Sequence, residues 1–281
     1  MQQIKDLVAT DISRSLFEKI QRGIALQPYR ELHISANGND ATADGTQEKP
    51  FKTLPKLLEY LNVLYSNSTS AKNIGIRFLT DFTYTEHLVL HYMTRWYILF
   101  NGNGKDVTLG SASIRRSNIR FNDVNFKPQT TFTNASCIDA DNHSLVVLNN
   151  CVFYEPKANV NFYLCCRYNS HMLIKGNIYL DFSENNSTVK DAFIAVYASS
   201  CTFNDGNIGL RSNITTQKFV STTRYGEFMM DASGKINSNG FTANCKKYCA
   251  SKYSTINLNG RGDSILLGNQ EGVLEQDGKV Y

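Results

Sequence analysis

The sequence predicts an all-β fold, a right-handed, three-sided parallel β-helix, and three observations lead to this prediction. Short β-prone runs alternate with turns rich in Asn, Gly, Ser and Asp over most of the 281 residues. These runs recur at a nearly constant spacing between residues 73 and 268. A strand, a polar loop and an amphipathic helix precede the first repeat, over residues 32–72.

The repeat consists of six segments in which a polar turn separates two apolar runs: 117–126, 144–153, 170–180, 200–210, 227–236 and 254–265. Their second runs are spaced by 26, 26, 30, 28 and 29 residues when these positions are taken as equivalent: Phe126, Val152, Ile178, Ile208, Ile236 and Ile265. A further short strand precedes most segments, at 137–140, 161–168, 191–198, 219–225 and 246–253. One coil of a β-helix fits this unit, whereas leucine-rich repeats are shorter and propeller blades span about 40–45 residues. Coils stacked about 4.8 Å apart give roughly seven turns.

Turn residues of successive coils are expected to lie above one another. A ladder of turn amides along one corner is predicted from Asn122, Asn149 or Asn150, Asn177, Asn207, Asn237 and Asn259. An Asn-rich sequence offers such coincidences freely, so the spacing of the apolar runs is the stronger evidence. Arg261-Gly262-Asp263 fills the turn of the last repeat, and we interpret it as a turn, not as an integrin-type motif.

Three further segments flank the repeat. Residues 1–31 are predicted to form an amphipathic helix and a linker, either packed on the same domain or used for attachment and oligomerisation. Residues 32–72 hold a strand at 32–35 and a helix that begins near Thr53 as N-cap, with Pro55 in its first turn. We expect that helix to cover the open end of the core. Residues 269–281 are predicted to form a small cap or an interface strand.

Composition excludes several classes of protein. The net charge is +4 without basic blocks, which argues against nucleic-acid binding. No apolar run reaches the roughly 18 residues of a membrane span, and the amino terminus lacks a secretory signal, so neither membrane insertion nor secretion is expected. The seven cysteines are an odd number and predict reduced, packed thiols. His143 and His171 lack a third ligand, so we predict neither a metal nor a cofactor.

The second segment resembles the amino-terminal signature of phage tail spikes and pectate-lyase-like β-helix proteins. The shared pattern stands here as Gly38-Asn39-Asp40, Gly45-Thr46 and Pro50-Phe51-Lys52-Thr53-Leu54. It spans some 35 residues, and it marks fold and context more than chemistry. The resemblance implies a homotrimeric virion tail protein, made in the bacterial cytoplasm, that binds bacterial surface polysaccharide. It also implies attachment to a phage tail or baseplate protein through residues 1–31.

Glycan binding requires an aromatic platform and polar groups that orient the sugar. Tyrosines recur in successive coils, and Tyr197, Tyr225 and Tyr253 are each 28 residues apart. The spacing predicts a vertical row of tyrosines with basic residues beside it, formed by Tyr168, Tyr197, Arg224, Tyr225, Lys252 and Tyr253. A row of half-buried packing tyrosines would give the same spacing.

Glycan cleavage is the alternative activity, and a bacterial adhesin or scaffold without a phage is a second alternative that the missing secretion signal disfavours. Glycosidases need two carboxyl groups about 5–5.5 Å or about 6.5–9.5 Å apart, which acidic residues one coil apart can supply. The candidate pairs are Glu155 with Asp181 or Glu184, and Asp205 with Asp231. A lyase base is also open, at Arg167, Arg224 or Lys252. The chain is short for a depolymerising spike, which favours binding over cleavage.

Overall fold

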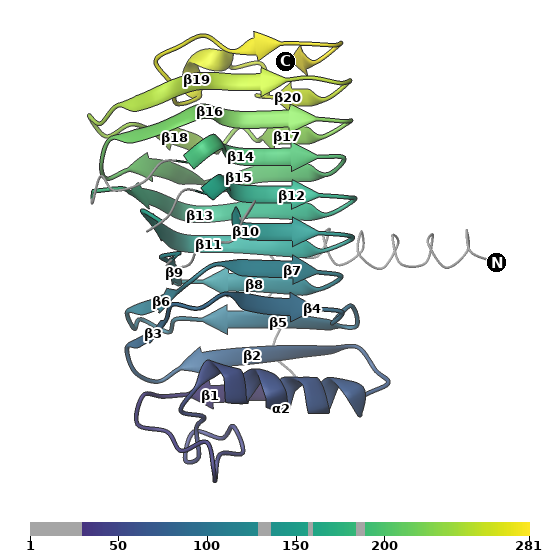
Figure 1. The fold of residues 1–281 in the computed structure, drawn as a ribbon, viewed down its shortest axis with the longest axis vertical. Coiled ribbons are helices and arrows are strands. Elements are labelled where there is room, and N and C mark those ends of the chain that lie inside the picture. Colours follow the sequence, from purple (N-terminus) through teal and green to yellow (C-terminus); the bar gives the residue numbers. More distant parts are fainter. Residues whose placement is uncertain (1–29, 129–135, 157–159, 184–188) are drawn as a thin grey trace, which may run out of the picture.

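The protein is a parallel β-solenoid of about seven turns, in which 54% of the residues belong to strands. The structure is a computed structural model, and it describes residues 30–128, 136–156, 160–183 and 189–281. Figure 1 shows the coils stacked along one long axis, from the purple first strand at one end to the yellow last strand at the other. The predicted helix and linker lie outside the described residues up to residue 29.

One sheet contains eight parallel strands, each from a different coil, in the spatial order β21-β19-β16-β14-β12-β10-β7-β4. Their bounds are β4 Leu88–His91, β7 Ala112–Arg115, β10 Ser136–Asp141, β12 Val160–Arg167, β14 Val189–Tyr197, β16 Ile214–Thr223, β19 Ala243–Ala250 and β21 Val273–Leu274. Five of them coincide with the short strands that the sequence places before the repeat segments, so this prediction is confirmed.

The second sheet contains 14 strands and follows a main path with a side path. The main path runs through β1 Arg30–Ile34, β2 Lys72–Phe78, β5 Trp96–Asn101, β8 Asn118–Asn122, β11 Leu145–Tyr154, β13 His171–Asp181, β15 Ser200–Leu210, β17 Glu227–Met230, β20 Thr255–Asn257 and β22 Lys279–Val280. The side path consists of β3 Phe82–Tyr84, β6 Val107–Leu109, β9 Asn125–Phe126 and β18 Lys235–Asn237. Strands β11 and β15 each pair with strands of both paths.

The residues chosen as equivalent from the sequence are partly wrong. Phe126 pairs with Phe153, and Ile178 pairs with Cys151, so Val152 belongs to neither column. The register shifts between Asn149 and Cys151, where β13 has one residue more than β11. Beyond this point Cys151 and Phe153 are the buried residues of β11, and Val152 between them is only half-buried. Ile178, Ile208 and Ile236 do align.

The parallel register places aromatic rings of successive coils above one another in the core. Phe126 stacks on Phe153 with ring centroids 5.4 Å apart, and Phe193 stacks on Phe219 at 5.6 Å. Phe153 also meets Phe193 edge to face at 6.5 Å, so the ladder runs through the middle of the solenoid. All seven cysteines are free and buried, which confirms the expectation of packed thiols.

The single α-helix of the described residues, α2 (Leu54–Ser66), lies next to β1 and β2 at one end of the stack (Figure 1). The predicted start is confirmed, because the Thr53 side chain accepts a hydrogen bond from the Lys56 N–H. The Asp40 carboxylate in turn accepts hydrogen bonds from the Thr53 hydroxyl at 2.6 Å and the Lys52 N–H at 2.7 Å. The motif from Gly38 to Leu54 thus ties the polar loop to the helix start. The buried Leu54, Leu57 and Leu61 belong to the main core cluster.

The last residues continue the solenoid. β21 pairs with β19, and β22 pairs with β20, both in parallel. A 3-10 helix at Asp263–Ile265 precedes these two strands. Residues 269–281 therefore add strands to both sheets.

The aromatic ladder predicts the cost of removing one ring. Phe153→Ala should lower the free energy of unfolding by about 3–5 kcal/mol, because the cavity lies between rings that the backbone register holds in place. Phe241→Ala should change it by less than about 0.5 kcal/mol, since Phe241 is 40% exposed. Urea unfolding followed by circular dichroism measures both values. Equal effects of the two substitutions would contradict the ladder.

Candidate functional site

A ridge of left-handed turns runs along the solenoid where the chain passes from the eight-stranded sheet to the main path of the 14-stranded sheet. Five of these turns begin with two residues of φ between 45° and 65°: Asn142–His143, Tyr168–Asn169, Arg224–Tyr225, Lys252–Tyr253 and Gln276–Asp277. The third residue of each is Ser or Gly: Ser144, Ser170, Gly226, Ser254 and Gly278. We call the exposed side chains of these turns, together with Tyr92 and Arg116 of the two preceding turns, the turn ridge.

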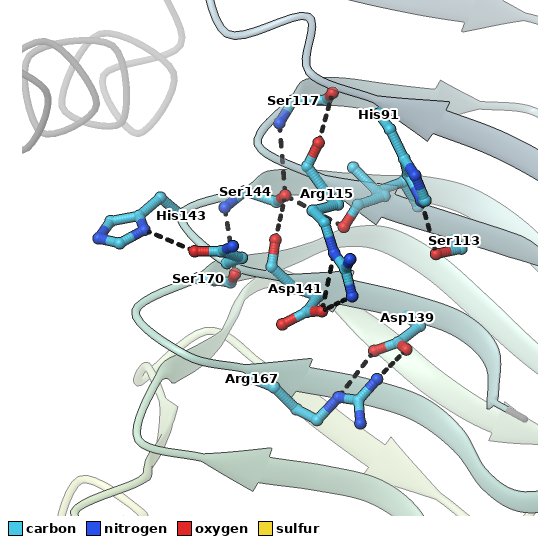
Figure 2. A network of polar contacts seen from close by, with 12 residues as sticks. His91, Ser113, Arg115, Ser117, Asp139, Asp141, His143, Ser144, Arg167 and Ser170 are labelled. Atoms are coloured by element: carbon cyan, nitrogen blue, oxygen red, sulfur yellow. Dashed lines mark hydrogen bonds and ion pairs between the residues drawn. The ribbon is translucent and has the colours of Figure 1, made fainter. Parts of the chain in front are cut away.

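Buried serines hold the turns in place from the inside. The Ser144 hydroxyl donates to the Asp141 carbonyl at 2.7 Å, which closes its own turn, and it accepts a hydrogen bond from the Ser117 N–H at 3.4 Å. The Ser144 N–H in turn donates to the Ser170 hydroxyl at 3.1 Å (Figure 2). The sequence analysis missed this column, although a serine opens most of the repeat segments.

Four tyrosines stand out from the ridge with more than half of their surface exposed: Tyr92, Tyr168, Tyr225 and Tyr253. All four have positive φ, between 52° and 64°. Left-handed backbone in a non-glycine residue costs on the order of 1–3 kcal/mol, and Asn, which tolerates it best, occupies equivalent positions at Asn142 and Asn169. A side chain that is more than half exposed recovers only part of this cost through burial. Exposed aromatic residues on left-handed backbone in a repeating turn therefore make the ridge a candidate binding surface.

Tyr225 and Tyr253 form the centre of this surface. Their rings lie 13° from parallel with centroids 5.6 Å apart, and they are 74% and 59% exposed. They belong to adjacent coils, since the Tyr225 N–H donates to the Lys252 carbonyl at 3.1 Å. The predicted alignment of these two tyrosines is confirmed.

Tyr197 does not belong to the row, which corrects the prediction. It pairs with Thr223, not with Tyr225, and it packs edge to face on Phe162 with centroids 5.6 Å apart. Burial raises the pKa of its hydroxyl. The coil from Tyr197 to its partner Thr223 is 26 residues long, so the tyrosine 28 residues after Tyr197 lies two positions further on, in the turn that follows β16.

Basic side chains accompany the tyrosines. Arg224 and Lys252 precede Tyr225 and Tyr253 in the same turns, and both are exposed. Arg116, which the sequence analysis missed together with Tyr92, places its guanidinium 6.0 Å from the centre of the Tyr92 ring. None of the ion pairs between described residues involves these three cations.

A ladder of ion pairs lies on the eight-stranded sheet beside the ridge (Figure 2). Arg115 donates to Asp141 at 2.8 Å, and Arg167 pairs with both carboxylate oxygens of Asp139. Burial raises the pKa of Asp139, although the charge of Arg167 acts in the opposite direction. Burial acts to lower the pKa of Arg167, but the charge and hydrogen bond of Asp139, together with the neighbouring Cys165 and Asp141, outweigh burial and raise that pKa. Arg167 is therefore unsuited to act as a lyase base.

The first pair of candidate carboxylates does not form. Tyr154 is the residue that pairs with Asp181, and Glu155 is only 3% exposed, so the two carboxylates do not face solvent side by side. The alternative partner Glu184 lies outside the described residues.

The second pair does come together. The Ser233 hydroxyl lies 2.8 Å from an oxygen of Asp205 and 2.6 Å from an oxygen of Asp231, so the two carboxylates are within the combined length of these hydrogen bonds. Burial acts to raise the pKa of Asp231, but hydrogen bonds from Ser233 and Gly234 and the charge of Arg261 outweigh it and lower that pKa. An open pocket of about 330 Å³ is lined by Asp205, Gly206, Asn207, Ser233 and Lys235.

Other features of this corner are structural. The Arg261 guanidinium donates to the backbone carbonyls of Leu258, Gly234 and Asp231, which fixes it in the turn and removes it from any integrin-type recognition. The predicted amide ladder is present in part: Asn149 donates to Asn122, and Asn207 donates to Asn177 at 3.1 Å. Asn237 instead accepts a hydrogen bond from a backbone N–H of its own turn.

Comparisons with known proteins assign the chain to no family, so only its structure can define the class of protein. Neither a protein-family model, nor a curated protein, nor a solved structure matches the chain. Within the described ranges, no helix is long and apolar enough to cross a membrane, and no three His, Cys, Asp or Glu side chains gather as a metal site would require. The fold and the ridge define a parallel β-solenoid with an exposed row of aromatic and basic side chains.

The ion-pair ladder predicts different roles for two adjacent arginines. Arg115→Met should lower the free energy of unfolding by about 1–3 kcal/mol, because it leaves the buried Asp141 carboxylate without its partner. Arg116→Met should change it by less than about 0.5 kcal/mol, since Arg116 is exposed and holds no carboxylate. Thermal unfolding of both variants measures the difference. The assignment fails if Arg116→Met is the more damaging substitution.

Proposed function

We propose that the chain binds bacterial surface polysaccharide through the turn ridge, as the receptor-binding spike or fibre protein of a phage tail. The observation that carries the proposal is the pair of parallel, exposed rings of Tyr225 and Tyr253 on strained turn backbone. The fold agrees with the resemblance of residues 38–54 to phage tail spikes, and the phage context rests on that resemblance.

The chemistry of the ridge suits a polymer of sugars. Aromatic rings contact the apolar faces of pyranose rings, while phenolic hydroxyls and turn amides satisfy sugar hydroxyls. Successive coils repeat about every 4.8 Å, so a chain lying along the solenoid meets similar groups several times. Weak contacts of this kind gain strength when several sites are linked. The proposed homotrimer, attached to a tail or baseplate protein through residues 1–31, would supply such linkage.

Substitution by asparagine separates binding from folding at these turns. The double variant Tyr225→Asn/Tyr253→Asn should lose at least about 1.4 kcal/mol of binding free energy, which is tenfold in Kd. Its melting temperature should stay the same or rise slightly, because Asn tolerates positive φ better than Tyr. Retention on intact bacteria or on purified surface polysaccharide measures the first effect, and calorimetry measures the second.

The matched control is Tyr281→Asn, which removes a tyrosine that is 58% exposed and follows β22 outside the ridge. It should leave both binding and melting temperature unchanged. Undiminished binding by the double variant would reject the turn ridge as the glycan site.

Cleavage of the polysaccharide is a second candidate function, and the bridged Asp205 and Asp231 in their pocket favour it. Their separation is within the combined length of two hydrogen bonds, which is compatible with the about 5–5.5 Å of a retaining glycosidase. If the pair is catalytic, Asp205→Asn and Asp231→Asn should each reduce the release of reducing ends by at least about 100-fold. Polysaccharide that is retained by the wild-type protein and never shortened would reject this second function.

A further inference from the structure

We propose that the turn ridge selects acidic polysaccharides, whose carboxylate or other anionic groups lie against Arg224 and Lys252 while the sugar rings contact Tyr225 and Tyr253. This inference rests on the proposed glycan binding and specifies its ligand class. It is carried by the charge arrangement of the ridge.

Arg224 and Lys252 occupy the same place in adjacent coils. Thr222 pairs with Ala250, two residues before each cation, and the two cations have φ of 52° and 54°. Coils are about 4.8 Å apart, so two positive side chains start from neighbouring backbone positions. Both cations lie in turns between strands, where like charges on adjacent coils repel one another as they do across a sheet. The arrangement therefore costs free energy in the unliganded protein, and a bound anion would offset that cost.

Four cations on or beside the eight-stranded sheet have carboxylate partners, whereas Lys246 of that sheet forms no ion pair among the described residues. The four ion pairs join Arg115 to Asp141, Arg167 to Asp139, Lys218 to Asp191, and Lys247 to Asp263. Among the described residues, no such pair includes Arg224 or Lys252. The acidic side chain of the ridge is Asp277, which occupies the place of Tyr253 one coil further on. The charge at Arg224 and Lys252 is thus available to a ligand.

The two kinds of cation suit an acidic sugar. The guanidinium of Arg224 presents a planar set of donors that matches a carboxylate, and the Lys252 ammonium adds a point charge. Because each cation directly precedes a tyrosine, one acidic sugar contacts both a ring and a charge. Single-stranded nucleic acid is also bound by aromatic rings and cations, but it requires a basic groove that follows the phosphate backbone. Between Arg116 and Arg224 the equivalent places hold Asn142, Tyr168 and Ala198, so the cations do not form a continuous basic groove and the ridge favours a glycan.

The test uses the full chain and purified bacterial capsular polysaccharides of known composition, some containing uronic acids and some neutral. We expect retention of acidic polysaccharides only, with affinity falling at least about tenfold from about 0.01 M to about 1 M salt, over which the Debye length shrinks from about 30 Å to about 3 Å. Arg224→Gln/Lys252→Gln should lose at least about tenfold in affinity, the change that 1.4 kcal/mol produces. Its melting temperature should not fall.

The control variant Lys105→Gln/Lys246→Gln removes the same number of charges from exposed positions outside the ridge and should bind like the wild type. Equal retention of neutral polysaccharide, or full affinity of the Arg224→Gln/Lys252→Gln variant, overturns the acidic specificity while glycan binding stands. The proposed function itself is rejected if the wild-type protein retains no polysaccharide and the Tyr225→Asn/Tyr253→Asn variant behaves in the same way. Retention of a single-stranded oligonucleotide in place of polysaccharide overturns both.

Discussion

The parallel backbone register between coils is the constraint on which the rest of the structure depends. Each strand hydrogen-bonds to the equivalent strand of the next coil, so a side chain finds a similar side chain about 4.8 Å above it. In the core this produces the ladder in which Phe126 stacks on Phe153. At the surface the same register stacks Tyr225 on Tyr253 and places Arg224 beside Lys252. One geometric rule thus creates both the stability of the solenoid and its most distinctive surface.

The register also explains why the fold could be predicted from sequence. A coil must have a nearly fixed length, and this length appears as the spacing of apolar runs between residues 73 and 268. The start of α2 was equally visible, because Thr53 and Pro55 are the residues that a helix start requires. The exact register, which changes when a coil is longer or shorter by one or two residues, could not be predicted from the sequence. The register shift beside Asn149 displaced Val152, and a coil of 26 residues between Tyr197 and Thr223, in place of the expected 28, removed Tyr197 from the row.

Side-chain chemistry was harder to predict than fold. The pairing of Arg115 with Asp141 depends on which residues of β7 and β10 lie side by side, and the spacing of residues in the sequence does not predict it. Asp205 and Asp231 were paired correctly because each lies close to a turn of the same corner. The pairing of Glu155 with Asp181 was wrong, since Glu155 follows the end of β11 with its side chain buried, while Asp181 aligns with Tyr154. Turn residues were therefore better guides to the surface than strand residues.

The short turn at Ala198 and Ser199 has a consequence for the length of any ligand. It replaces the bulky pair found in neighbouring coils with two small residues, so Tyr168 on one side and Tyr225 with Tyr253 on the other form separate contact zones. If the ridge binds glycans as proposed, an oligosaccharide of a few units would fit one zone alone, while a polymer would span the interruption and contact both zones at once. Affinity should therefore increase in steps with chain length, and fragments too short to bridge the gap would compete poorly with intact polymer.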